Sequence, residues 1–235
     1  TVSLLAYLID RTHHALVCRR RSRALLRRLR AGREGAKGRP LTLEGRYEPQ
    51  ELLVAPLSGA RVAGYRVLLE VPADNWINRR VVVDFGRLAG GRFIPSRSTG
   101  LEPLEVEGGA VDLLVPEPCL QGRRRGGSQD EPQGFPDEVA RVLAERAQIR
   151  AEARDPHRYR WAEYHLHGNE ALVAWGAVGR SEGDDDQRMV FGAGGEQPFF
   201  VSTAPWQRLA EGLDDPDAAW LRALPGPAFD DRSAE

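Results

Sequence analysis

The sequence contains little cysteine and a single lysine. The first shortage excludes some classes of protein, and the second means that the positive charge comes from arginine. Only two cysteines, Cys18 and Cys119, occur in 235 residues, and they lie in very different sequence contexts. Two cysteines cannot form a disulfide framework or a four-ligand zinc site, and they favour a reducing compartment. Because Lys37 is the one lysine, arginine supplies almost all of the positive charge. That bias suits a GC-rich bacterial genome.

The sequence also lacks an apolar segment long enough to cross a bilayer by itself. Thr1–Asp10, TVSLLAYLID, is apolar but much shorter than the roughly 18 to 20 residues that a spanning helix needs. It could be the cytosolic end of a longer spanning helix, an interfacial helix or a core element. The acidic segment 214–235 has no apolar run of spanning length either, and we expect it to be partly disordered.

Frequent turn residues argue against a helical bundle, because 25 glycines and 16 prolines punctuate nearly every apolar run after residue 40. Short β candidates occur at residues 41–47, 51–54, 62–71, 79–85, 92–95, 111–115, 160–180 and 189–191. Helical patterns occur at 136–154, where Pro136 suits the first turn, and at 205–213, where Ser202 or Thr203 is the expected cap. The expected fold is therefore α+β and mainly β: a small antiparallel sandwich or barrel-like body with one mid-chain helix, one C-terminal helix and a basic N-terminal helix.

Charge is distributed unevenly along the chain. Residues 1–39 carry eleven basic residues against Asp10 and Glu34, a net charge of +9, which leaves about -10 for the remainder. Within this arm, residues 13–30 have helical periodicity. Cys18, Ser22, Leu25, Leu26 and Leu29 fall near one face and arginines cover the others.

A basic amphipathic helix that follows an apolar segment is typical of a membrane-proximal stem. The arginines that we expect to contact anionic lipid are Arg19, Arg20, Arg21, Arg23, Arg27 and Arg28. The positive-inside rule would then place the body on the cytoplasmic side. A solvated arm, or a helix packed on a neighbouring subunit, is the plainer alternative. Nucleic-acid binding is less favoured, because aromatic residues are not interleaved with the arginines.

Two stretches predict reversals between β runs. In the first, Pro56, Ser58 and Gly59 separate residues 52–54 from residues 62–71, and Gly59 can take the positive φ of a tight turn. In the second, the turn 167–169 separates two runs, and Gly168 or Asn169 supplies the left-handed residue of a hairpin.

Three motif blocks resemble a known family. The first block comprises Gly45, Pro49, Pro56, Leu57, Ser58, Gly59, Val62, Tyr65, Arg66, Val67 and Glu70. The second comprises Glu163, Leu166, Gly168, Leu172 and Gly176, and the third is the segment PFFVST at 198–203. In this order they resemble the GIDE domain, also called BAM for "beside a membrane", over about residues 41–213. Its best-known carriers are mitochondrial membrane-anchored E3 ubiquitin ligases, and many bacterial proteins have it without the ligase part.

The resemblance implies a membrane-side interaction module rather than a ligase. A RING finger needs eight Cys and His ligands for two zinc ions, and the sequence contains nothing like one. Together with the charge pattern, the resemblance gives an expected organisation of an apolar and basic arm at 1–31, a linker at 32–40, a GIDE-like domain at 41–213 and an acidic tail at 214–235. Within the domain we expect a loop at 119–135, a helix at 136–154 and an acidic loop at 181–187.

Candidate chemistry is sparse. His165 and His167, at i and i+2 on a strand, could bind a metal with His157 or Glu163. Simple alternation of polar residues with Tyr164 and Leu166 is the favoured explanation. Ser58 lies in a sharp turn but lacks a G-x-S-x-G elbow, and the sequence assigns it no histidine or acid. We therefore expect no catalytic residues, no cofactor and no resident metal.

The expected function is that of a non-enzymatic scaffold in a bacterium, at the cytoplasmic face of the inner membrane or in the cytoplasm. Its partners would be anionic lipid, an unidentified protein and other copies of the chain. Trp76, in a polar turn, and Trp220, in the tail, are the expected partner contacts. Two alternatives remain open: an accessory subunit of a ubiquitin-like conjugation system, and a soluble protein that forms rings or filaments.

Overall fold

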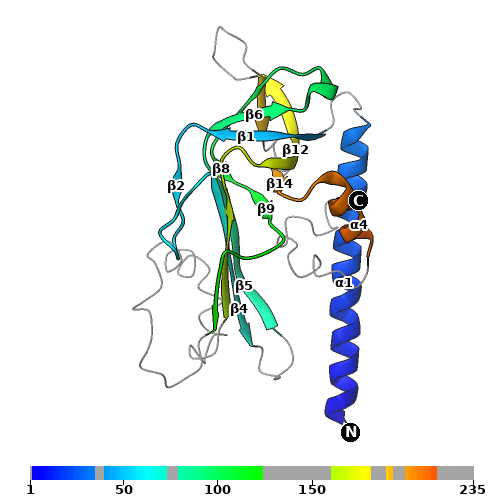
Figure 1. Ribbon diagram of the computed structural model, residues 1–235. Helices are drawn as coiled ribbons and strands as arrows, with labels where there is room; N and C mark the ends of the chain where they lie inside the picture. The colour runs from blue at the N-terminus through cyan, green and yellow to red at the C-terminus, as the bar shows by residue number, and fades with distance from the viewer. Residues whose placement is uncertain are drawn as a thin grey trace.

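The computed structural model describes residues 2–34, 40–72, 79–123, 160–180, 189–192 and 199–215. These residues form two α-helices, fourteen strands and the short 3-10 helix η1 (Arg97–Thr99). The predicted class, α+β and mainly β with a barrel-like body, is confirmed (Figure 1). The expected helix at 136–154, the loop at 181–187 and nearly all of the tail lie outside the described residues.

Five strands close into a small barrel, since the last strand of the series pairs with the first. The ring runs through β1 (Leu41–Pro49), β6 (Gly91–Pro95), β7 (Leu104–Val106), β13 (Met189–Gly192) and β12 (Ala171–Arg180), which returns to β1. Aromatic rings fill part of the interior: the Phe191 ring centroid lies 5.3 Å from that of Phe93 and 5.1 Å from that of Phe199. Closure leaves few open strand edges in this part of the fold.

A second, antiparallel sheet packs against the barrel. Its order is β10 (Leu120–Arg123), β11 (Arg160–Leu166), β4 (Gly64–Pro72), β5 (Arg79–Leu88) and β8 (Gly109–Ala110). Leu68, Tyr164 and Leu166 from this sheet belong to the same buried cluster as Phe93 and Phe191 of the barrel. One continuous core therefore joins the two sheets.

The predicted reversal around Gly59 is confirmed. The short strands β2 (Leu53–Val54) and β3 (Arg61–Val62) pair antiparallel, and Gly59 has φ of 70°. Ala55 and Val62 pack on Tyr65 and Val67 of β4. The hairpin thus covers the face of the second sheet that points away from the main core.

The apolar segment at the start of the chain and the basic segment that follows it form a single helix, α1 (Val2–Arg33). Three of its leucines, Leu25, Leu26 and Leu29, are buried in a second core. This core also contains Leu114, Val173, Trp175, Phe200, Ala204, Leu209 and Leu213. The last two belong to the second helix, α4 (Trp206–Asp214), which lies beside α1 (Figure 1). The predicted helical face of the arm therefore packs on the body of the protein.

Strand β12 connects the two cores, because it is buried on both faces. Leu172 and Ala174 point into the main core, whereas Val173 and Trp175 point into the second. The flanking strands β14 (Phe200–Ser202) and β9 (Asp112–Leu114) extend the barrel sheet beside it. Because successive side chains of a strand point to opposite faces, one sheet can contact the barrel interior on one face and the helices on the other.

The end of α1 lies two residues inside the segment 32–40 that we expected to be a linker. A Cβ at Gly32 would lie 2.5 Å from Thr42 Oγ1, so the helix and β1 approach too closely there for any other residue. Thr42 Oγ1 also donates a hydrogen bond of 2.7 Å to the Leu29 carbonyl. Gly32 thus permits close packing of helix on strand rather than a break in the helix.

Strand β10 corrects the expectation of a loop at 119–135. Leu120 to Arg123 pair with residues 163 to 160 of β11. The expectation rested on low apolar content, but backbone hydrogen bonds to a neighbouring strand do not require apolar side chains.

The turn at residues 167–169 is confirmed, with Asn169 at φ of 66°, but the hairpin around it is wrong. β11 pairs with β4 and β10, while β12 pairs with β1, β13 and β14. The turn is therefore a corner between two sheets. The Asn169 amide donates a 2.8 Å hydrogen bond to the Tyr47 carbonyl, which ties this corner to β1.

The start of α4 also differs from the expectation. Neither Ser202 nor Thr203 caps it: the N-cap residue is Pro205, without a side-chain capping bond. Ser202 Oγ instead accepts a 3.2 Å hydrogen bond from the Ala204 amide, inside the turn that precedes the helix.

A buried ionic cluster lies between the two sheets. Arg66, which is 1% exposed, forms a bidentate salt bridge with Asp84: Nε donates to Oδ1 at 2.7 Å and Nη2 donates to Oδ2 at 2.8 Å. Its Nη1 donates to the Leu113 carbonyl at 3.3 Å. Burial, followed by the charge of Asp84, raises the pKa of Asp112 to about 7, and Arg66 opposes this rise. Asp112 is thus the member of the cluster that can exchange a proton near neutral pH.

We predict that replacing Asp112 by Asn stabilises the protein above neutral pH. The folded-state pKa of Asp112 is about 7 against an ordinary 3.8, so the folded state binds more protons between these values and stability falls as pH rises through that window. The difference in unfolding free energy between D112N and the natural chain should grow from near zero at about pH 4 to at most about 4 kcal/mol above pH 7. Urea denaturation across this pH range measures it. The exposed Asp214→Asn is the control, and a pH-independent difference for D112N would contradict the assignment.

We predict that α1 contributes to global stability. Replacing the fully buried Leu29 by Ala should cost about 2 to 5 kcal/mol, because it leaves a cavity in the second core. Leu16→Ala on the same helix, where the side chain is 54% exposed, should change stability by less than about 0.5 kcal/mol. Chemical denaturation of both variants decides the point. Equal stability of the two would mean that α1 does not dock in solution.

Candidate functional site

Glu163 organises the end of β11 where the strand turns toward the barrel. Its carboxylate has no exposed surface and accepts hydrogen bonds from two amides of the β2–β3 turn, Leu57 N at 2.6 Å and Ser58 N at 3.2 Å. Its Oε1 also lies 2.8 Å from His165 Nε2. A buried carboxylate is tolerated only when such partners replace water. Glu163 thereby fixes both the turn and the His165 ring.

Ser58 lies beside His165, which the sequence did not predict. Ser58 Oγ is 3.3 Å from His165 Nε2, so the structure assigns Ser58 both a histidine and, through Glu163, an acid. In a catalytic triad the serine and the acid bind opposite ring nitrogens. Here both approach the same nitrogen, Nε2, and Ser58 Oγ also accepts a bond from the Ala60 amide at 3.2 Å. This arrangement positions the turn but cannot relay a proton from Ser58 to Glu163.

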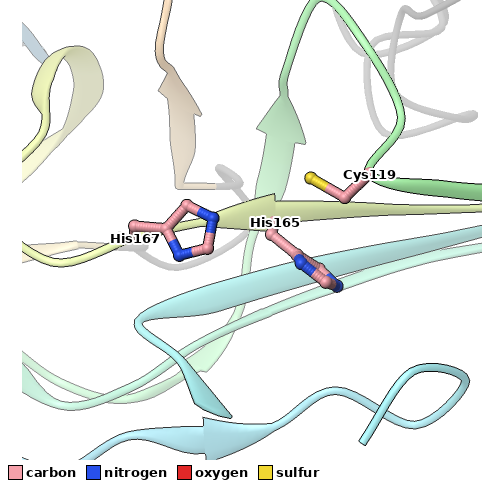
Figure 2. Close-up of side chains that lie close together, drawn as sticks. All are labelled: Cys119, His165 and His167. Carbon is pink, nitrogen blue, oxygen red and sulfur yellow. The ribbon is translucent and has the colours of Figure 1, made fainter. Parts of the chain in front are cut away.

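Cys119, His165 and His167 come together on one side of β11. One ligand atom from each, the thiol sulfur and a ring nitrogen of each histidine, lies within 4.8 Å of the others (Figure 2). The two imidazole rings are 5.9 Å apart and nearly perpendicular. His165 is buried, whereas Cys119 and His167 are exposed. We call these three residues the Cys–His cluster.

The sequence predicted only part of the Cys–His cluster. It paired His165 and His167 and proposed His157 or Glu163 as the third ligand; His157 lies outside the described residues, and Glu163 instead binds the His165 ring. Cys119 was missed because its place depends on β10. The Cys119 amide donates a 2.9 Å hydrogen bond to the Glu163 carbonyl, at the start of the pairing with β11. Predicting a strand at 120–123 that pairs with β11 would have placed Cys119 beside the histidines.

A second candidate site is a row of exposed arginines along α1. Arg20, Arg23, Arg27 and Arg30 are exposed, and their spacing of three and four residues places them on one face. We call these four residues the arginine face. The row spans about 15 Å along the helix. It lies on a different side of the helix from Leu25, Leu26 and Leu29, so the docking of those leucines fixes the direction in which the arginines point.

Only half of the arginines expected to contact lipid belong to the arginine face. Arg20, Arg23 and Arg27 do, and Arg30 joins them. Arg19, Arg21 and Arg28 are partly buried, and the Nε atoms of Arg19 and Arg21 are fully covered. Arg33 serves the docking of the helix: it pairs with Glu44 at 3.0 Å and its guanidinium lies 4.5 Å from the centre of the Trp206 ring.

The arginine face is electrostatically unfavourable in isolation. Like charges three or four residues apart destabilise a helix by about 0.2 to 0.5 kcal/mol per pair. Arg30 gains some compensation because it lies in the last turn, where the helix dipole favours positive charge. An anion bound along the arginine face would reduce the repulsion among Arg20, Arg23 and Arg27.

The tryptophans expected to contact partners, Trp76 and Trp220, lie outside the described residues. Of the others, Trp175 is buried in the second core, and Trp206 is partly buried beneath Arg33.

Among the described residues, α1 included, no helix combines the length and the apolar character that crossing a bilayer requires. Comparison with protein-family models, with curated proteins and with solved structures gave no match. The resemblance of the three motif blocks to the GIDE domain stays a prediction from the residues.

Proposed function

We propose that the protein is a non-enzymatic docking module that lies beside an anionic membrane and contacts it through the arginine face. The observation that supports this proposal best is the combination of a docked and an exposed side on α1. Leu25, Leu26 and Leu29 anchor the helix in the second core, and four arginines occupy the exposed row. The positive charge is thus presented by a helix held in a fixed direction.

The electrostatic attraction between the arginine face and an anionic membrane is strong enough for reversible binding. Each arginine close to an anionic surface contributes on the order of 1 kcal/mol, so the row supplies about 4 kcal/mol at low salt. Interactions with lipid headgroups are screened over about 10 Å at 0.1 M salt, so the attraction requires direct approach of the helix. A contact of this strength is suited to a peripheral protein rather than to one inserted in the bilayer.

The proposal retains the expected location at the cytoplasmic face of a bacterial inner membrane: the resemblance to the GIDE domain implies a position beside a membrane, and the positive-inside rule implies the cytoplasmic side. The body of the protein, including the second sheet, would then be available to a protein partner or to another copy of the chain. A solvated helix whose arginines bind nothing is the competing explanation, and vesicle binding distinguishes the two.

We predict that the chain binds vesicles containing phosphatidylglycerol and not vesicles of phosphatidylcholine alone. Replacing Arg20, Arg23, Arg27 and Arg30 by Gln should weaken binding by as much as roughly a thousandfold at low salt, the equivalent of about 4 kcal/mol. Flotation of the full chain with each vesicle type measures the bound fraction.

A matched control removes the same charge elsewhere. Arg46, Arg61, Arg92 and Arg97 are exposed on the β body, so their replacement by Gln changes the net charge equally. This variant should retain most of the binding. If both variants bind anionic vesicles equally well, general charge and not the arginine face is responsible, and the proposal fails.

A further inference from the structure

We propose that the Cys–His cluster is a binding site for one divalent transition-metal ion, and that zinc suits it best. Cys119, His165 and His167 offer one thiol and two imidazoles, and the three ligand atoms already lie within 4.8 Å of one another. The residues come from the position just before β10, the end of β11 and the turn after it, so the pairing of the two strands brings them together.

The geometry requires only a small adjustment to hold the ion. Tetrahedral zinc, with bonds of about 2.3 Å to sulfur and about 2.0 to 2.1 Å to nitrogen, sets its ligand atoms roughly 3.3 to 3.6 Å apart. The separations of up to 4.8 Å must therefore shorten by at most about 1.2 to 1.5 Å. Cys119 and His167 are exposed, so rotation of their side chains can achieve this without moving the core.

The buried ligand has the supporting carboxylate that metal-binding histidines usually have. His165 Nε2 lies 2.8 Å from Glu163 Oε1, which orients the ring and leaves Nδ1 as the atom we assign to the metal. Glu163 is itself held by the amides of Leu57 and Ser58. The least exposed ligand is therefore fixed in direction before any metal binds.

The donor set selects the class of ion. A thiolate and two imidazoles suit zinc and similar transition metals, whereas magnesium and calcium prefer oxygen ligands. Binding releases the Cys119 thiol proton to solvent as the sulfur–metal bond forms. Three protein ligands leave one tetrahedral position for a water molecule or a ligand from outside.

We predict that Co²⁺, which takes the place of zinc and is visible by absorption, binds the full untagged chain at one ion per molecule. A near-ultraviolet charge-transfer band should report the thiolate bond, and excess Zn²⁺ should remove it. Cys119→Ser should abolish this band. His167→Ala should weaken Co²⁺ binding by more than the 10- to 100-fold that loss of a supporting residue causes, because a direct ligand is lost.

The controls exploit the exposure of both replaced side chains. Substitution of exposed residues should leave the fold unchanged, which circular dichroism verifies. The Cys18→Ser/His14→Ala double variant removes one thiol and one imidazole from α1, and it should bind Co²⁺ as the natural chain does. Absence of the charge-transfer band in the natural chain, or its persistence in the Cys119→Ser variant, would overturn the site.

Discussion

The hydrogen bonds of the buried Glu163 carboxylate hold the β2–β3 turn and the His165 ring in place against the second sheet. The carboxylate has no contact with solvent, and burial of a charged group is costly unless hydrogen bonds replace its water. The Leu57 and Ser58 amides and the His165 ring provide these bonds. Because the partners come from the β2–β3 turn and from β11 itself, satisfying one carboxylate sets the turn conformation and the direction of the His165 ring together.

A second constraint acts at the opposite side of β12. Val173 and Trp175 point away from the barrel and form, with Leu25 and Leu29 of α1, a core that the barrel alone would leave exposed. An apolar face of this kind must be covered, and α1 and α4 cover it. The consequence for function is indirect. Residues that dock α1 determine where its arginines point, so the direction of the charge follows from the packing of uncharged side chains.

Much of the fold could be predicted from the sequence because strands and turns are local signals. Apolar runs and turn residues located β1, β4, β5 and β12, and the positive φ of Gly59 followed from its residue type. For the second turn the sequence left Gly168 and Asn169 as alternatives, and the structure places the positive φ at Asn169. Pairing is not local, which is why the Asn169 turn was assigned to a hairpin instead of a corner. The same limit concealed Cys119, which lies more than forty residues from His165 in sequence and approaches it only through the β10–β11 register. The leucines of α1 predicted a helix with an apolar face, but the same pattern suits a membrane and a protein core equally.

The two proposed sites are physically separate, and that separation bears on how they could work together. The β2–β3 hairpin, whose turn binds Glu163 and His165, lies on the other side of the second sheet from α1 (Figure 1). A bilayer in contact with the arginine face would therefore leave Cys119 and His167, both exposed, facing solvent. The two sites also use different physics: the arginine face acts through screened charge that weakens with salt, whereas thiolate and imidazole bonds to a metal respond to pH. A protein anchored by α1 could present a metal-stabilised surface to a partner without either site disturbing the other.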